Sequence, residues 1–337
     1  MEDLFSRRLI IQSGKGGTGK TTISAALAVA AASRGKRVLL VEVDTRDRFA
    51  PLFGLKEPVG YEVREVRDGV FALNLDPELV IIDFFKTHVK LKTIYKQVLE
   101  SKIFKYFYEA APGVKEIICM GKVWRLLGER HFFSGKPQWD CVILDAPATG
   151  HGISLLNIAQ AAYETLFGPM KKHAEKIRDM LRDPKLTVLN IVAIPEEMPV
   201  NEAADLYQLA KGELRMPLGV AFLNAMMPPL FTPEESAALD REGRAGDRLE
   251  RILGGPRAVG ALLACARSRD ERAQMARRYE TRLRELIPLP VVPVPYVFDA
   301  DFDLGTLEAV AKEVAAALAP AAAPHKRAAG REGSRDS

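Results

Sequence analysis

A short glycine-rich stretch near the N-terminus carries the residue types best suited to chemistry. It satisfies the pattern G-x-x-x-x-G-K-[ST]. Glycines let a backbone wrap closely around a phosphate because no Cβ blocks the approach. Their N–H groups, together with the start of the following helix, face the anion. The pattern therefore predicts a loop that binds the phosphates of a nucleotide. In order, its residues are Gly14, Lys15, Gly16, Gly17, Thr18, Gly19, Lys20, Thr21 and Thr22.

Three side chains at the end of this loop have predicted roles. Lys20 is expected to reach the β- and γ-phosphates, and Thr21 to give its hydroxyl to Mg²⁺. Thr22 is expected to donate on the α-phosphate side. The alternative is a glycine-rich strand-to-helix turn that binds nothing. The position of the loop, between a strand ending near Ser13 and an alanine-rich helix, favours phosphate binding.

Lys15 adds a second cation near the start of the loop. It cannot easily reach the phosphates that Lys20 serves in its own chain. Across a symmetric dimer it could reach the nucleotide of the partner and neutralise developing charge, as an arginine finger does. The alternative is a solvated lysine. The residue types thus predict a homodimer with Lys15 acting in trans.

Two carboxylates follow predicted strands at the same edge of the sheet. Asp44 comes after the second strand, at the carboxyl edge where open α/β folds bind ligands. It could orient or deprotonate an attacking water, or it could be a strand-end cap. Asp145 follows the third strand and is expected to contact Mg²⁺ directly or through water. The predicted ligands are therefore a nucleotide and Mg²⁺, and the predicted reaction is hydrolysis of the terminal phosphate.

Short apolar, β-branched runs separated by helical patterns position these residues. Near-continuous apolar runs are what a sheet covered on both faces requires. Strand and helix alternate, so we expect an α/β fold with a doubly wound, mostly parallel sheet. The expected strands are Leu9–Ile11, Val38–Val43, Cys141–Leu144, Val188–Ile194, Gly219–Leu223 and Val291–Val294.

The strand–helix alternation is interrupted by helical sequence, which we interpret as a helical subdomain inserted at about residues 84–133 and 153–183. Apolar residues from Ile94 to Phe107 recur at spacings of three and four, which defines one helix face. That face could bind a client protein, or it could pack against the sheet or against the partner protomer of a dimer. The charged segment from Pro233 to Leu286 reads as a solvated helical surface. We expect one ATPase domain over 1–318 and a disordered tail over 319–337.

The bulk composition narrows the class of protein. With 337 residues, 47% hydrophobic residues and a formal net charge of +4, the chain lacks the basic excess typical of a nucleic-acid binder. Its three cysteines are far apart, so no disulfide framework or four-cysteine zinc site is expected within one chain. No secretory signal and no run of about 18 apolar residues is visible. The sequence predicts a cytoplasmic protein without a transmembrane segment.

The loop and the segment after the third strand resemble known families. K-G-G-x-G-K-T-T is the signature of the deviant Walker A class, which includes MinD, ParA, the nitrogenase iron protein and ArsA. The segment from Asp145 resembles switch II of the ArsA family, D-T-A-P-T-G-H. Asp145, Thr149, Gly150 and His151 fall in register, while Pro147 lies one place early. The resemblance implies an ATPase in which His151 helps to sense the γ-phosphate.

The resemblance to the ArsA family extends over about residues 8–318. It implies that Asn224 reads adenine and that Pro295 lines the adenine pocket. The sequence departs from the family after Asp44, where the usual D-P-A-H is replaced. It also lacks the CxxC that clamps zinc between subunits in the eukaryotic members, and Cys265 stands alone near that region. Neither a zinc-clamped dimer nor an arsenite site is therefore expected.

These observations predict a dimeric switch that hydrolyses Mg²⁺-ATP and couples its nucleotide state to a client protein or membrane partner through the helical subdomain. One alternative is a positioning ATPase of the MinD or ParA type, acting on a membrane or nucleoid surface. It lacks support from the last predicted helix, Leu307–Leu318, which is alanine-rich with a single lysine. A non-hydrolysing scaffold is disfavoured because Lys20, Asp44 and Asp145 are all present.

Overall fold

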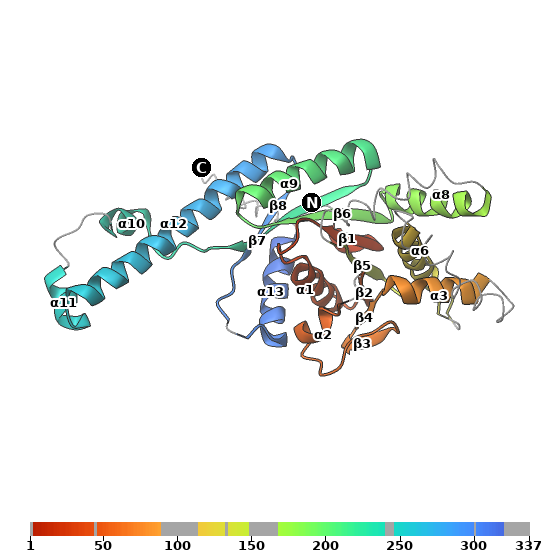
Figure 1. The fold of residues 1–337 in the computed structure, drawn as a ribbon, viewed down its shortest axis with the longest axis horizontal. Helices are drawn as coiled ribbons and strands as arrows, with labels where there is room; N and C mark the ends of the chain where they lie inside the picture. The colour runs from red at the N-terminus through yellow and green to blue at the C-terminus, as the bar shows by residue number, and fades with distance from the viewer. Residues whose placement is uncertain are drawn as a thin grey trace, which may run out of the picture.

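The computed structural model describes residues 3–43, 46–88, 114–131, 134–147, 168–239, 246–299 and 301–319. Within them lies one eight-stranded sheet in the order β3-β4-β2-β5-β1-β6-β7-β8 (Figure 1). The neighbours are all parallel except β3 and β4, which are antiparallel. The strands are β1 (Leu9–Ser13), β2 (Val38–Glu42), β3 (Arg64–Arg67), β4 (Val70–Asn74), β5 (Cys141–Asp145), β6 (Thr187–Ala193), β7 (Leu218–Met226) and β8 (Val291–Pro295).

The doubly wound, mostly parallel sheet is confirmed, and the six predicted strands are present. The strands β3 and β4 were not predicted. β4 is a short apolar segment after the turn at Gly69, which has a φ of +74°. β3 is charged and pairs only with β4, as expected for an edge strand, so it carries no apolar run that would reveal it.

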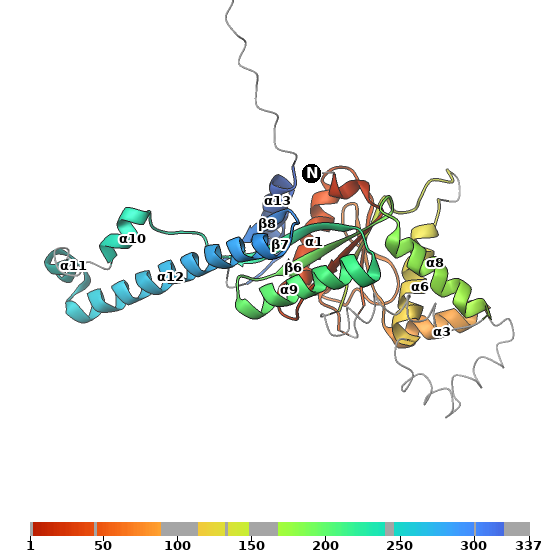
Figure 2. The same cartoon turned by 90° about the horizontal axis from the view of Figure 1, so that it is seen from above.

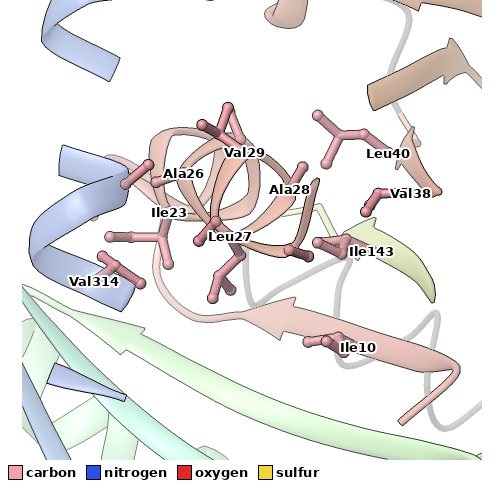
Figure 3. Packing of buried hydrophobic residues seen from close by; sticks show 14 of the residues in the cluster. Ile10, Ile23, Ala26, Leu27, Ala28, Val29, Val38, Leu40, Ile143 and Val314 are labelled. Atoms are coloured by element: carbon pink, nitrogen blue, oxygen red, sulfur yellow. The ribbon is translucent and has the colours of Figure 1, made fainter. Parts of the chain in front are cut away.

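One face of the sheet is covered by α1 (Lys20–Ala32), α2 (Phe49–Leu52) and α13 (Leu304–Ala317). Alternate strand residues, such as Ile10 and Ile143, point into this layer and are fully buried. Figure 3 shows Ile23 of α1 close to Val314 of α13, with Ile10 on the neighbouring strand. The alanine-rich sequence of α1 lets it pack closely on both the sheet and α13, which fixes the helix that follows the phosphate loop.

The opposite face is covered by α3 (Pro77–His88), α6 (Val114–Gly128) and α8 (Gly168–Arg182). These helices pack against one another, and Ile81, Ile117 and Ile177 share a core with Leu9 and Ile11 of β1. The helix α3 begins before the predicted start of the subdomain at residue 84. The apolar stripe from Ile94 to Phe107, residues 153–167 and the tail from 320 lie outside the described residues.

A third cluster joins the far end of the sheet to α9 (Glu197–Leu209) and α12 (Pro256–Leu286). Ala276 and Leu283 of α12 are buried there, whereas the first half of the helix extends away from the sheet beside α10 (Pro233–Leu239) and α11 (Gly246–Leu253) (Figure 2). The predicted solvated helix is thus right for the first half of α12, while its second half is part of the core. Two short elements, the 3₁₀ turn η1 (Leu4–Ser6) and the π turn η2 (Ala210–Leu214), complete the described chain. None of the helices in the described ranges is sufficiently long and apolar to span a membrane.

Candidate active site

The predicted phosphate loop joins β1 to α1 at the carboxyl edge of the parallel strands. Two glycines lie where no side chain fits. A Cβ on Gly14, whose φ is +152°, would lie 2.1 Å from the carbonyl oxygen of Val192 on β6. A Cβ on Gly19, whose φ is +83°, would lie 2.2 Å from Nδ2 of Asn224 on β7. The loop is thus held tightly against two neighbouring strands, while Gly16 and Gly17 form its exposed tip.

Lys20 lies inside this loop. Its side chain is buried, and its Nζ donates a 2.9 Å hydrogen bond to the carbonyl oxygen of Lys15. Thr18 Oγ1 donates to the same oxygen at 2.9 Å. Burial lowers the pKa of Lys20, although the nearby Asp145 carboxylate acts in the opposite direction. The ammonium group therefore bridges the loop, where it can meet a phosphate held by the loop backbone.

Asp145, the last residue of β5, meets the first turn of α1. Thr21 Oγ1 donates to Oδ2 of Asp145 at 2.7 Å, and Ser24 Oγ donates to Oδ1 at 3.1 Å. Burial raises the pKa of the Asp145 carboxyl to about 6, against the two hydroxyl hydrogen bonds and the charge of Lys20. Ser24 was not predicted. Its position three residues after Thr21, on the same helix face, was the signal that could have revealed it.

A second buried carboxylate, Glu42, ends β2 beside Asp145 in the sheet register. It accepts a 3.1 Å hydrogen bond from the Arg48 backbone N–H and lies 3.8 Å from Arg48 Nε. Sequence reasoning missed it, although an acidic residue inside a buried strand is an unusual feature. Asp44 and Thr45, which follow this strand, lie outside the described residues. Asp47 accepts backbone hydrogen bonds from Phe49 and Ala50 at 3.0 Å, so it caps α2.

Lys15 does not extend freely into solvent. Its Nζ lies 2.5 Å from Oε1 of Glu202 on α9, and each side chain is about a third exposed. Glu202 was not foreseen, because it is 187 residues away in the sequence and belongs to no motif. The lysine is thus ion-paired within its own chain. Its predicted action across a dimer remains a prediction.

Asn224 reaches the phosphate loop from β7. Its Nδ2 donates a 3.0 Å hydrogen bond to the carbonyl oxygen of Thr18. The next residue, Ala225, has a φ of +56° at an irregularity in the pairing of β7 with β8. Pro295 pairs with Met226 in that register, so both predicted adenine contacts lie at the carboxyl edge of the sheet. The contact of Asn224 with the loop backbone was not predicted.

The predicted switch II is described only at its start. Asp145 is buried and Pro147 is half-buried. Thr149, Gly150 and His151 lie outside the described residues, so their predicted roles stay predictions. The two threonines at the end of the loop, Thr21 and Thr22, are half-buried on the first turn of α1.

The chain is similar to several known ATPases. A family model described as an anion-transporting ATPase, ArsA_ATPase, matches residues 7–168. The ATPase BagA of Mycobacterium tuberculosis is 30% identical over 237 residues, which cover 68% of each chain. The ATPase GET3C of Arabidopsis thaliana is 25% identical over 277 residues, covering 68% of this chain and 69% of the relative.

A further relative extends the comparison to bacteria outside the mycobacteria. The arsenical pump-driving ATPase of Escherichia coli is 29% identical over 210 residues, covering 57% of this chain and 35% of the relative. The matched family region contains the loop with Lys20 and the strand that ends in Asp145. By its sequence and its fold, the chain belongs to the ArsA family of ATPases, which bind and hydrolyse ATP.

Proposed function

We propose that the chain hydrolyses Mg²⁺-ATP as a homodimer and that its nucleotide state controls the binding of a client protein or membrane partner. The observation that carries the proposal is the convergence of Thr21 and Asp145 beside the buried Lys20. A hydroxyl, a carboxylate and an ammonium group then face the same phosphate loop. This combination is what phosphoryl transfer needs, since its catalysis consists mainly of positioning and charge stabilisation.

The residues at this point fit a magnesium ion. Mg²⁺ prefers oxygen ligands and keeps several waters. Thr21 can offer an oxygen lone pair to the ion while its hydroxyl still donates to the Asp145 carboxylate, which then holds the threonine or a bound water in place. Bound there, Mg²⁺ would supply positive charge to the β- and γ-phosphate oxygens.

Asp44 is the proposed group that orients or deprotonates the attacking water. It follows β2, whose last residue, Glu42, pairs with Asp145 in the sheet register. A carboxylate placed shortly after that strand end belongs to the same edge as the phosphate loop. The neighbouring Asp47 is engaged in capping α2, which leaves Asp44 as the proposed catalytic carboxylate of this loop.

Lys15 is the proposed contribution of the partner protomer. In its own chain its ammonium group pairs with Glu202 on α9, while Lys20 binds the carbonyl oxygen of Lys15. The pair is partly exposed, so a second chain can approach it. Across a dimer, the ammonium group would neutralise charge that develops on the partner's triphosphate.

The proposed output runs through switch II into the helices on one face of the sheet. The chain leaves β5 at Asp145, passes Pro147 and reaches α8 at Gly168. That helix packs on α6, which packs on α3. A change around the γ-phosphate would thus act first on the segment that connects β5 to α8 in the sequence.

An arsenical is not the proposed substrate, although the name of the Escherichia coli relative refers to one. Of the three cysteines, Cys119 and Cys141 are buried in different core clusters. Cys265 is exposed on the half of α12 that extends away from the sheet. Burial raises the pKa of Cys119 and of Cys141 to about 12. The thiolates that a soft metalloid ligand would require are therefore disfavoured at both buried positions.

The proposal is tested by trapping the ATP-bound form with Asp44→Asn. Sedimentation velocity with Mg²⁺-ATP is expected to give a dimer. Phosphate release is expected to fall by roughly 10²-fold or more, because the carboxylate that activates water is lost. The exposed Asp68→Asn serves as the matched control and should turn over like the parent. A variant that stays monomeric with Mg²⁺-ATP, or that hydrolyses it at the parental rate, contradicts the proposal.

A further inference from the structure

The ion pair between Lys15 and Glu202 joins the phosphate loop to a helix that has no other assigned part in the site. Lys15 Nζ lies 2.5 Å from Glu202 Oε1. Glu202 belongs to α9, the helix that follows β6. The contact therefore links the first variable position of the loop to an element outside the sequence motifs.

The two partners are held by a rigid framework. Ser13, just before the loop, pairs with Ile191 of β6, and Gly14 lies against the Val192 carbonyl. On the other side, Val200 and Ala203 of α9 are buried in the same cluster as Ile191. The backbone positions at both ends of the pair are thus fixed by strand pairing and core packing, and only the two side chains can rearrange easily.

The ammonium groups of Lys15 and Lys20 both have partners within one chain. The carbonyl oxygen of Lys15 accepts from Lys20 Nζ, while the side chain of Lys15 pairs with Glu202. For Lys15 to serve the nucleotide of a partner, its ammonium group must exchange the carboxylate of Glu202 for a phosphate oxygen. Glu202 and the partner's triphosphate therefore compete for the same cation.

We propose that Glu202 is a positioning residue that restrains Lys15 on its own protomer and so opposes assembly of the active dimer. This inference rests on the proposed action of Lys15 in trans. Because the pair is partly exposed, water screens it, and the restraint is weak enough for a triphosphate to displace it. The ion pair thus holds Lys15 in place until a partner chain brings its nucleotide close enough to replace Glu202.

The test is the dependence of ATPase rate on protein concentration for the parent and for Glu202→Gln. The amide keeps the size of the side chain and removes its charge. The concentration that gives the half-maximal rate is expected to fall about two- to fivefold, with the two curves converging at high protein concentration. Sedimentation with a non-hydrolysable ATP analogue should show the same shift in dimer formation. Glu197→Gln, on the exposed side of the same helix, is the matched control and should follow the parent curve.

A double-mutant cycle separates this inference from the proposed function. In a Lys15→Ala background, Glu202→Gln is expected to have no further effect on dimer formation, because the restrained group is gone. Suppose that Lys15→Ala loses hydrolysis but Glu202→Gln does not lower the protein concentration that gives the half-maximal rate. The proposed restraint by Glu202 is then contradicted, while the proposed action of Lys15 in trans is not. If Lys15→Ala hydrolyses ATP like the parent, the proposed trans role fails and the inference falls with it.

Discussion

Thr21 Oγ1 donates a 2.7 Å hydrogen bond to Asp145 Oδ2, and this contact connects the start of α1 to the end of β5. The two residues are 124 positions apart in the sequence. They meet because β1, which leads into the loop, pairs in parallel with β5, so that Gln12 lies opposite Asp145. The phosphate loop and its predicted metal-binding carboxylate are thus brought together by the sheet itself.

Removing the hydroxyl of this contact is expected to weaken the use of magnesium. Thr21→Val keeps the shape of the side chain but cannot offer an oxygen to the ion. We expect the apparent affinity for Mg²⁺ in the ATPase reaction to fall by roughly 10- to 100-fold. Magnesium titrations of the steady-state rate measure this. Thr281→Val, at an exposed position on α12, is the control. An unchanged magnesium midpoint would remove Thr21 from the metal site.

Asn224 is expected to support both the loop and the recognition of the base. Asn224→Ala removes the donor to the Thr18 carbonyl and the predicted contact with adenine. ATP affinity should fall by roughly 2- to 10-fold, which corresponds to the loss of about one net hydrogen bond. If Asn224 also reads adenine, GTP affinity should fall less than ATP affinity. Equilibrium binding of the two nucleotides decides this, and an equal loss for both would limit Asn224 to holding the loop.

Asp83 of α3 is the centre of a charged cluster that should make part of the stability depend on pH. It accepts hydrogen bonds from Tyr61 Oη at 3.1 Å, Lys122 Nζ at 2.8 Å and Arg125 Nη2 at 2.5 Å. Burial opposes ionisation of the carboxyl. The hydrogen bonds and charges of Lys122 and Arg125 outweigh burial and lower the pKa of Asp83 to about 2.

A lowered pKa in the folded state means that ionised Asp83 stabilises the fold above its ordinary pKa, and that this contribution is lost as pH falls from about 4 to about 2. Asp83→Asn should therefore lower the free energy of unfolding by about 1 kcal/mol at pH 7, since the cluster is partly exposed. The difference from the parent should shrink at pH 3. Urea unfolding at both values measures this, and a difference that grows on acidification would contradict the assignment.

The parts of the site that the sequence predicted are those encoded by neighbouring residues. Glycine spacing, the strand before it and the alanine-rich helix after it all lie within residues 9–32, and each is confirmed in the structure. Asp145 likewise lies at the end of a buried apolar strand, as predicted, while its contact with Mg²⁺ stays a prediction. Local patterns suffice here because the phosphate loop is formed by consecutive residues.

The contacts that sequence reasoning missed depend on the topology. Glu202 meets Lys15 only because β6 lies beside β1 and delivers α9 to that edge. Glu42 is likewise a buried carboxylate whose surroundings depend on a strand register. The second half of α12 has a charged sequence but buries Ala276 and Leu283, since a narrow stripe of small and apolar residues is sufficient to dock a helix.

Mixing two inactive variants tests most directly whether the two lysines of one loop serve two different nucleotides. Lys15→Ala and Lys20→Ala should each hydrolyse little ATP alone. In a mixed dimer, one site combines Lys20 of the first variant with Lys15 of the second. The equimolar mixture should recover roughly a quarter of the parental rate, as about half of the dimers are mixed and each has one complete site. Mixed dimers that form, as shown by co-purification of two tags, but remain inactive would contradict action in trans.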